Sequence, residues 1–227
     1  QSKPLYMWFD CEGNYATLSH PDSIRYYVSK IHDMGFTDVV VDVKSIMGET
    51  LYKSDIAPYM GEWDGVTRPE NYDLLGYFIE EGHKLGMRVH GSLNVFAGGH
   101  NFFDRGIIYG DHADWQSQVY TEGKIVPISE IKSNYNGMLN PANPEVQEYE
   151  LAILREFAEK YPDVDGIVFD RVRFDNITSD FSPLSKELFE AYCENANAGH
   201  ALMGEAYFAQ GFSLGVRLLQ FRSLQVA

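Results

Sequence analysis

The sequence predicts an α/β protein with four strand–helix units of a parallel (β/α) barrel. Short apolar runs alternate with amphipathic stretches over residues 1–195, an order typical of a parallel sheet with right-handed crossovers. The connections from helix to strand are tight, whereas two connections from strand to helix are far longer than usual. Long loops therefore collect at the carboxyl ends of the strands, which is the catalytic end of barrels of the TIM type.

The predicted strands are short apolar runs, and the second is rich in β-branched valine. They cover residues 5–10, 38–44, 88–96 and 166–170. The predicted helices carry an apolar stripe at helical spacing. The first follows Ser19 as N-cap, with Asp22 as the acid of a capping box, and Gly35 ends it as a left-handed cap would. The others cover about 71–85, a stretch that opens at Asn143–Pro144, and about 182–193.

The C-terminal part of the chain has a different pattern. Residues 1–195 are expected to form the (β/α)4 portion, and residues 196–227 a helical tail without a clear strand. Four units are half of an eight-fold barrel, so we interpret the chain as a half or truncated barrel. The outer strands of such a half keep open edges, which invite pairing. We therefore expect self-association through these edges, or coverage of one edge by the tail.

Composition and charge indicate which partners suit the chain. The formal net charge is -15 and aromatic residues make up 14%. This field would repel a nucleic-acid backbone, whereas uncharged sugars fit it. No run approaches the roughly 20 apolar residues of a membrane span. We expect an oligosaccharide or polysaccharide as partner, without nucleic acid and without a membrane span.

One face of the predicted sheet becomes polar toward the ends of the strands. Alternate residues of a barrel strand point into the barrel or toward the helices, and the apolar parity of each strand suits the helices. The alternate residues that point into the barrel include Asp10, Asp42, Asn94 and Asp170, which are predicted to meet at the mouth of the barrel. Buried carboxylates without partners are costly, so their convergence indicates a functional site rather than four separate turn caps.

Asp170 is the candidate catalytic nucleophile or charge stabiliser. It ends an apolar run. Arg171 and Arg173 follow closely and could keep it ionised, and Arg173 is predicted as its electrostatic partner. A purely structural Asp–Arg pair is the alternative for these residues. Glycoside hydrolysis also needs a second carboxyl as general acid. The candidates for this acid, among which spacing does not choose, are Asp10, Glu12, Asp42 and Glu49.

Further side chains are predicted to line a sugar subsite, because aromatic rings on loops suit stacking against sugars. The predicted substrate-binding residues are Asp10, Glu12, Asp42, Lys44, Glu49, Tyr52, His90, Asn94, His100, Asn101 and Trp115. No cofactor and no metal is expected, because the histidines lack the spacing of a zinc motif. A metal-dependent hydrolase that uses His90 and Asp170 stays open as a further possibility.

Seven segments in a fixed order carry a resemblance to a known family. They are residues 6–10, 35–44, 48–52, 78–87, 90–94, 139–146 and 165–170. Over about residues 4–192 the chain resembles the glycosyl-hydrolase-like family ten proteins, relatives of the alpha-amylase superfamily, particularly those of Bacteroides-type gut bacteria. The resemblance implies a (β/α)8 barrel, a secreted or periplasmic setting and glycan hydrolysis. It also makes Asn94 similar to the strand-three Asn and Asp170 to the strand-four nucleophile of the amylase pattern.

The amylase pattern places its general acid at the end of a fifth strand, and this sequence shows no such strand. We therefore expect a glycoside-hydrolase-like protein with Asp170 as nucleophile-equivalent that hydrolyses poorly or not at all as it stands. The alternative is a non-catalytic carbohydrate-binding protein, in which the same aromatic and acidic side chains hold a glycan.

Overall fold

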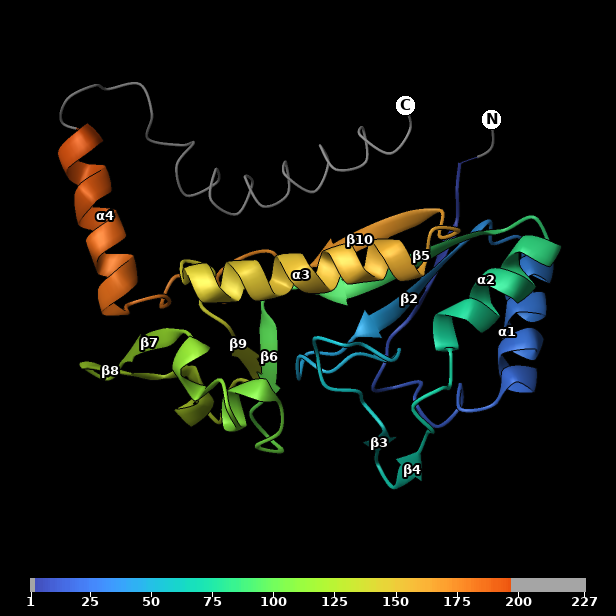
Figure 1. Ribbon diagram of the computed structural model, residues 1–227, viewed down its shortest axis with the longest axis horizontal. Helices are drawn as coiled ribbons and strands as arrows, with labels where there is room; N and C mark the ends of the chain where they lie inside the picture. The colour runs from blue at the N-terminus through green and yellow to red at the C-terminus, as the bar shows by residue number, and fades with distance from the viewer. Residues whose placement is uncertain (1–2, 197–227) are drawn as a thin grey trace.

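The computed structural model describes residues 3–196. Its main sheet has four parallel strands in the order β1-β2-β5-β10. These strands are Tyr6–Phe9, Asp38–Lys44, Arg88–Asn94 and Gly166–Asp170. The helices α1 to α4 that follow them along the chain are Pro21–Asp33, Leu74–Lys84, Pro144–Lys160 and Pro183–Ala196. The predicted alternation of strands and helices, with a parallel sheet, is confirmed (Figure 1).

α1 begins one residue later than the sequence predicted. Its N-cap is His20 rather than Ser19, and the His20 side chain accepts the backbone N–H of Asp22. Pro21 explains the shift, because proline favours the first helical position and the cap must precede it. At the other end, Gly35 has a φ of 91°, which confirms the predicted left-handed cap.

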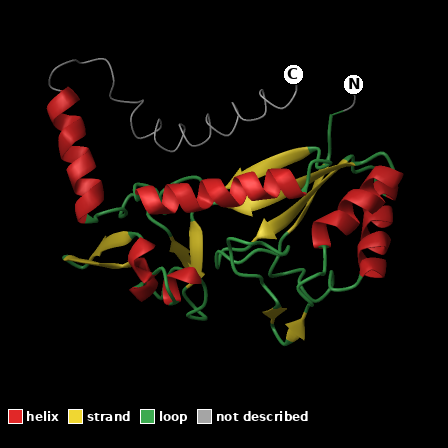
Figure 2. Ribbon diagram, viewed as in Figure 1, coloured by secondary structure: helices red, strands yellow, loops and turns green. Residues whose placement is uncertain are grey.

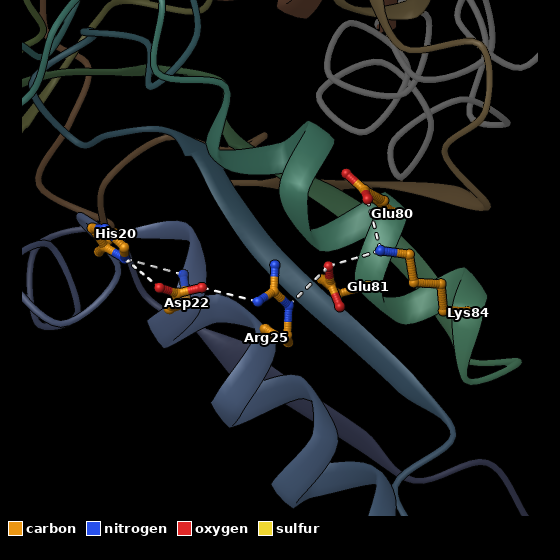
Figure 3. A network of polar contacts seen from close by, with 6 residues as sticks. All are labelled: His20, Asp22, Arg25, Glu80, Glu81 and Lys84. Atoms are coloured by element: carbon orange, nitrogen blue, oxygen red, sulfur yellow. Dashed lines mark hydrogen bonds and ion pairs between the residues drawn. The ribbon is translucent and has the colours of Figure 1, made fainter.

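A chain of ion pairs connects α1 to α2. Arg25 of α1 lies 2.9 Å from Asp22 and 3.4 Å from Glu81 of α2. Lys84 lies 2.6 Å from Glu80 and 2.9 Å from Glu81, so Glu81 is shared between the two helices (Figure 3). Most of these side chains are more than half exposed, and water screens such pairs strongly. The network therefore orients the two helices more than it stabilises them.

Three small antiparallel sheets lie at the end of the main sheet to which its strands point (Figure 2). They pair β3 (Glu62–Trp63) with β4 (Val66–Thr67), β6 (Ala97–His100) with β9 (Asn136–Met138), and β7 (Gln118–Thr121) with β8 (Lys124–Pro127). Short 3-10 helices span Ile107–Tyr109, Ala113–Trp115 and Ile128–Glu130. All of them form within the two long strand-to-helix connections, which are therefore structured.

The helix-facing side of the main sheet forms the core. Val39, Val41, Val89 and Leu93 are at most 1% exposed, and α3 crosses in front of the sheet (Figure 1). Gly91 lies among them, and a Cβ at this position would come within 2.4 Å of the Phe157 ring of α3. The close approach of helix and sheet therefore requires glycine here.

The predicted tail, residues 196–227, lies outside the described residues except for Ala196 at the end of α4. The half or truncated barrel and the boundary after residue 195 accordingly stay predictions. Within residues 3–196, no helix combines the length and the apolar character of a membrane-spanning segment.

Candidate functional site

The polar ends of the four strands lie at one end of the main sheet. The parallel register places Asp42 beside Ser92 of β5, and Asn94 beside Asp170. Neighbouring strands are about 4.8 Å apart, so these groups come from adjacent strands. Asp10 directly follows β1 at the outer edge of the sheet. The structure therefore brings the four predicted residues Asp10, Asp42, Asn94 and Asp170 to the same end.

Asp42 is a buried carboxylate without a cationic partner in the described part of the chain. It is 6% exposed, and its Oδ1 accepts the indole N–H of Trp8 at 2.8 Å. Burial raises the pKa of Asp42 to about 6, and the nearby carboxylates of Asp10 and Glu12 act in the same direction, against hydrogen bonds from Ser92 and Trp8. A carboxyl that keeps a proton close to neutral pH has the property of a general acid.

Glu12 is a second carboxyl whose proton is held more tightly than usual. Its Oε2 accepts the thiol of Cys11 at 2.7 Å. Burial raises the pKa of Glu12 despite that hydrogen bond, and the carboxylate of Asp10 raises it further. Asp10 itself is exposed, and its Oδ1 accepts the backbone N–H of Gly13. The ends of β1 and β2 thus form an acidic cluster in which nearby negative charge disfavours the ionisation of Asp42 and Glu12.

Asn94 and Asp170 are joined by the residue that follows β10. Arg171 donates from Nε to Oδ1 of Asn94 at 2.8 Å, and its backbone N–H donates to Oδ1 of Asp170 at 2.7 Å. Its guanidinium also donates to the Tyr135 hydroxyl at 3.1 Å. Arg171 has a φ of 55°, which is uncommon for a residue with a Cβ. This turn directs one arginine to the ends of two strands.

Arg173 does not pair with Asp170 as predicted. Its Nη1 donates to the backbone oxygens of Phe174 and Asp175, at 3.1 and 2.8 Å. No ion pair joins it to Asp170 within residues 3–196. The physical reason is that β10 ends at Asp170 and the chain turns at Arg171, so strand alternation no longer decides which way Arg173 points.

Lys44 lies on the opposite side of the sheet from that predicted. The register between β2 and β5 shifts between Asp42 and Lys44, so Lys44 reaches α3 instead of the strand mouth. It is fully buried, and its Nζ donates to Glu150 at 3.0 Å and to the carbonyl oxygens of Asn94 and Val95. Burial lowers the pKa of Lys44 and raises that of Glu150. Lys44 therefore lies between the sheet and α3, beneath the candidate site, and is not free to bind substrate.

His90 lies at the other end of the sheet. It pairs with Gly166, the first residue of β10, whereas Asp170 is four positions further along, about 13 Å away. Its Nε2 is 2.8 Å from Asp38, which also pairs with Arg88. This geometry argues against a sugar subsite or a metal site that joins His90 to Asp170. Among the described residues, no group of three or more His, Cys, Asp or Glu is placed to hold a metal ion.

Glu49 is held by an arginine of the following loop. Arg105 donates to its two carboxylate oxygens at 3.0 and 2.7 Å, and also reaches Glu62 at 3.4 Å. A cavity of about 320 Å³ beside this pair is lined by Glu49, Pro58, Gly106, Ile107, Asp111 and His112. Glu49 therefore ties two loops together at the border of the cavity and is a poor candidate for the proton donor.

Three other predicted substrate residues belong to the core. Tyr52 is 2% exposed and packs against Phe157, with ring centres 5.9 Å apart. Trp115 is 8% exposed and stacks on His112 at 3.7 Å. Asn101 is 1% exposed, and its amide donates to backbone carbonyls of the segment before β9. Their contacting surfaces are covered by protein atoms, so they cannot hold a sugar in this conformation.

His100, in contrast, lies within an exposed group of aromatic rings. Its ring centre is 4.6 Å from that of Phe103, 5.7 Å from Phe102 and 5.8 Å from Tyr135. Phe102 and Phe103 are 59% and 62% exposed. The structure therefore leaves His100 beside a surface that a ligand can reach.

The sequence profile of the glycosyl hydrolase-like 10 family matches residues 7–202. The chain belongs to this family. An S-layer-related protein of Niallia circulans is 32% identical over 200 residues, which are 84% of this chain and 12% of that protein. The glycosyl hydrolase DigH of Escherichia coli (strain K12) is 29% identical over 151 residues, which are 60% of this chain and 31% of that protein. The chain thus spans less than a third of the length of either relative.

Solved structures show that this glycosyl hydrolase-like 10 chain shares its fold with part of a glycosidase. An α-L-fucosidase isoenzyme 2 from Paenibacillus thiaminolyticus superposes with a TM-score of 0.62 at 14% identity, over 96% of this chain and 29% of that one. A hypothetical protein from Ruminiclostridium thermocellum ATCC 27405 gives 0.52 at 19% identity, over 82% of this chain and 90% of that one. The first likeness supports a fold of the TIM-barrel glycosidase type.

One residue of the candidate site, Trp8, was missed by the sequence-based predictions, and another, Arg171, has a contact that they did not include. Trp8 holds Asp42, and Arg171 joins Asn94 to Asp170. Trp8 could have been found, because it shares its strand parity with Asp10. Arg171 was considered only as a residue that could keep Asp170 ionised, because its contact with Asn94 depends on a left-handed turn that the residue type does not favour.

Proposed function

We propose that this chain carries glycan-binding and catalytic carboxyls of a glycoside hydrolase. The observation that supports the proposal most strongly is Asp42, a buried carboxyl with its pKa raised to about 6 at the same sheet end as Asp170. Perturbed carboxyls cluster at catalytic sites more often than elsewhere. The family and the names of its relatives, among them a glycosyl hydrolase, agree with a carbohydrate substrate.

Hydrolysis of a glycosidic bond needs a proton donor and a carboxylate. In this proposal, Asp42 gives its proton to the leaving glycosidic oxygen, because its raised pKa keeps a protonated fraction near neutral pH. Asp170 attacks or stabilises the anomeric carbon, because a backbone N–H orients its carboxylate. Asn94 and Arg171 position the sugar beside it. Glu12, whose pKa is also raised, is the other candidate for the proton donor.

The direct test is turnover of neutral glucans and of peptidoglycan-type glycans by wild type and by Asp170→Asn. We expect this substitution to lower kcat by about 10³-fold or more, as loss of a catalytic carboxylate does, while binding persists. Arg173→Ala is the matched control, because Arg173 contacts only backbone oxygens nearby. Unchanged turnover by Asp170→Asn would remove Asp170 from the mechanism.

The alternative proposal is a carbohydrate-binding protein without catalysis. It is favoured by one observation, that no arginine side chain pairs with Asp170 in the described part of the chain. In this case the wild type binds a glycan but releases no product, and Asp170→Asn changes only affinity.

Three further expectations about the chain are proposals of the same kind. A secreted or periplasmic setting and a Bacteroides-type origin follow from the resemblance, although the relatives named above come from Niallia circulans and Escherichia coli. Self-association is proposed because β1 and β10 are the outer strands of the main sheet, and open edges favour pairing. Light scattering tests it, since a monodisperse monomer at all concentrations would exclude it.

A further inference from the structure

An exposed group of aromatic side chains borders the strand ends. Its members come from the hairpin β3–β4, from the end of β6 with the loop after it, and from the residue before β9. They are Trp63, His100, Phe102, Phe103 and Tyr135, and they are called the aromatic patch below. Phe102, Phe103 and Tyr135 are 59%, 62% and 43% exposed. Exposed aromatic groups of this kind mark interaction sites more often than isolated exposed rings do.

The aromatic patch is held rigidly by polar contacts beneath it. The backbone N–H of His100 donates to the carbonyl of Arg105 at 2.7 Å, and the backbone N–H of Phe103 donates to the carbonyl of His100 at 3.1 Å. The guanidinium of Arg105 lies 5.6 Å from the Trp63 ring centre while it pairs with Glu49. Because these contacts order the backbone of the loop, ligand binding costs less conformational entropy there than on an unstructured loop.

The aromatic patch is continuous with the candidate catalytic end of the sheet. Arg171 donates to Asn94 on one side and to the Tyr135 hydroxyl on the other, and its guanidinium carbon lies 5.7 Å from the Tyr135 ring centre. No ion pair involves Arg171 within residues 3–196. Arg171 therefore connects the aromatic patch to the strand ends.

We propose that the aromatic patch is a stacking subsite for a neutral oligosaccharide whose chain continues past Arg171 to the strand ends. Sugar rings suit this surface because they have apolar C–H faces for the aromatic rings and hydroxyl groups at their edges. Arg171, Arg105 and Glu62 provide donors and acceptors along the border. The net charge of -15 disfavours an anionic chain. This inference rests on the proposed function, since it extends the same glycan site.

The test measures binding of chitohexaose, cellohexaose and maltohexaose by calorimetry. The proteins are wild type, Asp170→Asn, the double variant Phe102→Ala/Phe103→Ala, and Tyr135→Ala. Tyr26→Ala is the matched control, because Tyr26 is 58% exposed on α1 and lies outside the patch. We expect at least one sugar to bind, with Kd raised about tenfold or more in the patch variants and unchanged in Tyr26→Ala. Thermal unfolding should stay close to wild type in the double variant, because both phenylalanines are exposed.

The outcomes separate the subsite from the proposed function. Binding that survives in all patch variants overturns the subsite and leaves catalysis at Asp170 untouched. Loss of binding in the patch variants, together with wild-type turnover by Asp170→Asn, supports the subsite and overturns the catalytic role. No binding of any of the three sugars at millimolar concentration overturns the subsite.

Discussion

Strand β2 has a buried aspartate at each of its ends, and the pKa values of these two aspartates are shifted in opposite directions. Asp38, at the amino end, pairs with Arg88 and His90 and accepts the hydroxyl of Thr37. Although burial opposes it, these hydrogen bonds hold the pKa of Asp38 below its ordinary value. Asp42, at the carboxyl end, has the uncharged partners Trp8 and Ser92, and burial raises its pKa to about 6.

This contrast agrees with the proposed function, in which the amino end of the sheet stabilises the protein and the carboxyl end carries the chemistry. A fully paired carboxylate lowers the free energy of the folded state. A buried carboxyl with a raised pKa raises that free energy at neutral pH, where it must ionise without a cationic partner. Proteins retain such destabilised groups where function needs them. In barrels, polar residues at the amino end usually serve stability and those at the carboxyl end serve catalysis. The predictions below test this division.

The largest expected effect is on turnover. If Asp42 is the proton donor, Asp42→Asn should lower kcat by about 10²- to 10⁴-fold, the range that general acids contribute. Asp38→Asn, the matched change at the other end of β2, should leave kcat per folded molecule close to wild type. Steady-state kinetics on a glycan that the wild type hydrolyses measures both. Equal losses of kcat in the two variants would contradict the division of roles between the two ends of β2.

Stability should respond in the opposite sense. Asp38→Asn should lower the free energy of unfolding by about 2 kcal/mol, because a buried carboxylate loses its charge-assisted hydrogen bonds with Arg88 and His90. Asp42→Asn should raise it at pH 7.5 by about 2–3 kcal/mol, the equivalent of a shift from 3.8 to about 6. Urea unfolding of both variants measures this. A destabilised Asp42→Asn protein at pH 7.5 would contradict the account.

The stability gained by Asp42→Asn should depend on pH, because it comes from the raised pKa of Asp42. The folded state binds the Asp42 proton more tightly than the unfolded state, so the stability from protonation is present below pH 3.8 and is lost as the pH rises to about 6. The advantage of Asp42→Asn should therefore be near zero at pH 4 and complete above pH 6. Asp38 acts in reverse, because its lowered pKa gives stability that is lost as the pH falls. Unfolding curves at several pH values between 4 and 7.5 check both trends.

A partly cancelling effect on stability is expected at Lys44, the last residue of β2. Lys44→Met alone should destabilise the fold by roughly 3–5 kcal/mol, because it leaves Glu150 buried without its partner. The double variant Lys44→Met/Glu150→Leu should recover most of this loss, within about 1 kcal/mol of wild type. Non-additive unfolding energies are thus the expected result, and additive losses would show that the pair is not coupled.

The smallest effect is expected at Arg173. Arg173→Ala should change the free energy of unfolding by less than about 0.5 kcal/mol, as substitutions at exposed surface sites usually do. Turnover should also stay at the wild-type level. A large loss of turnover would restore Arg173 as the partner of Asp170, against the contacts described above.

Strong local signals predicted the main elements well. The bounds of β2 and β10 were predicted to the residue, because a valine-rich or apolar run ends there in a charged residue. The hairpins β3–β4 and β7–β8 were missed. Their turns, Asp64–Gly65 and Glu122–Gly123, have the positive φ values that are typical of two-residue hairpin turns. Their strands are only two to four residues long, so the apolar pattern was too short to read.

The positions of the candidate site residues were predicted where strand alternation holds and mispredicted where it fails. Asp10, Asp42, Asn94 and Asp170 lie at one sheet end, because alternation continues to the ends of their strands. Lys44 follows a register shift and Arg173 follows a left-handed turn, and neither irregularity is visible in residue types. Tyr52, Asn101 and Trp115 look like loop residues in sequence, but tertiary packing of the long connections buries them.

The titration of the two β2 aspartates is the most direct test of the account. NMR of the side-chain carboxyl carbons of Asp38 and Asp42 in the intact chain would report both pKa values in one experiment, with the Asp38→Asn and Asp42→Asn variants for assignment. The account predicts that Asp42 titrates near pH 6 and Asp38 below pH 3.8. Two carboxyls that titrate together near pH 4 would contradict it.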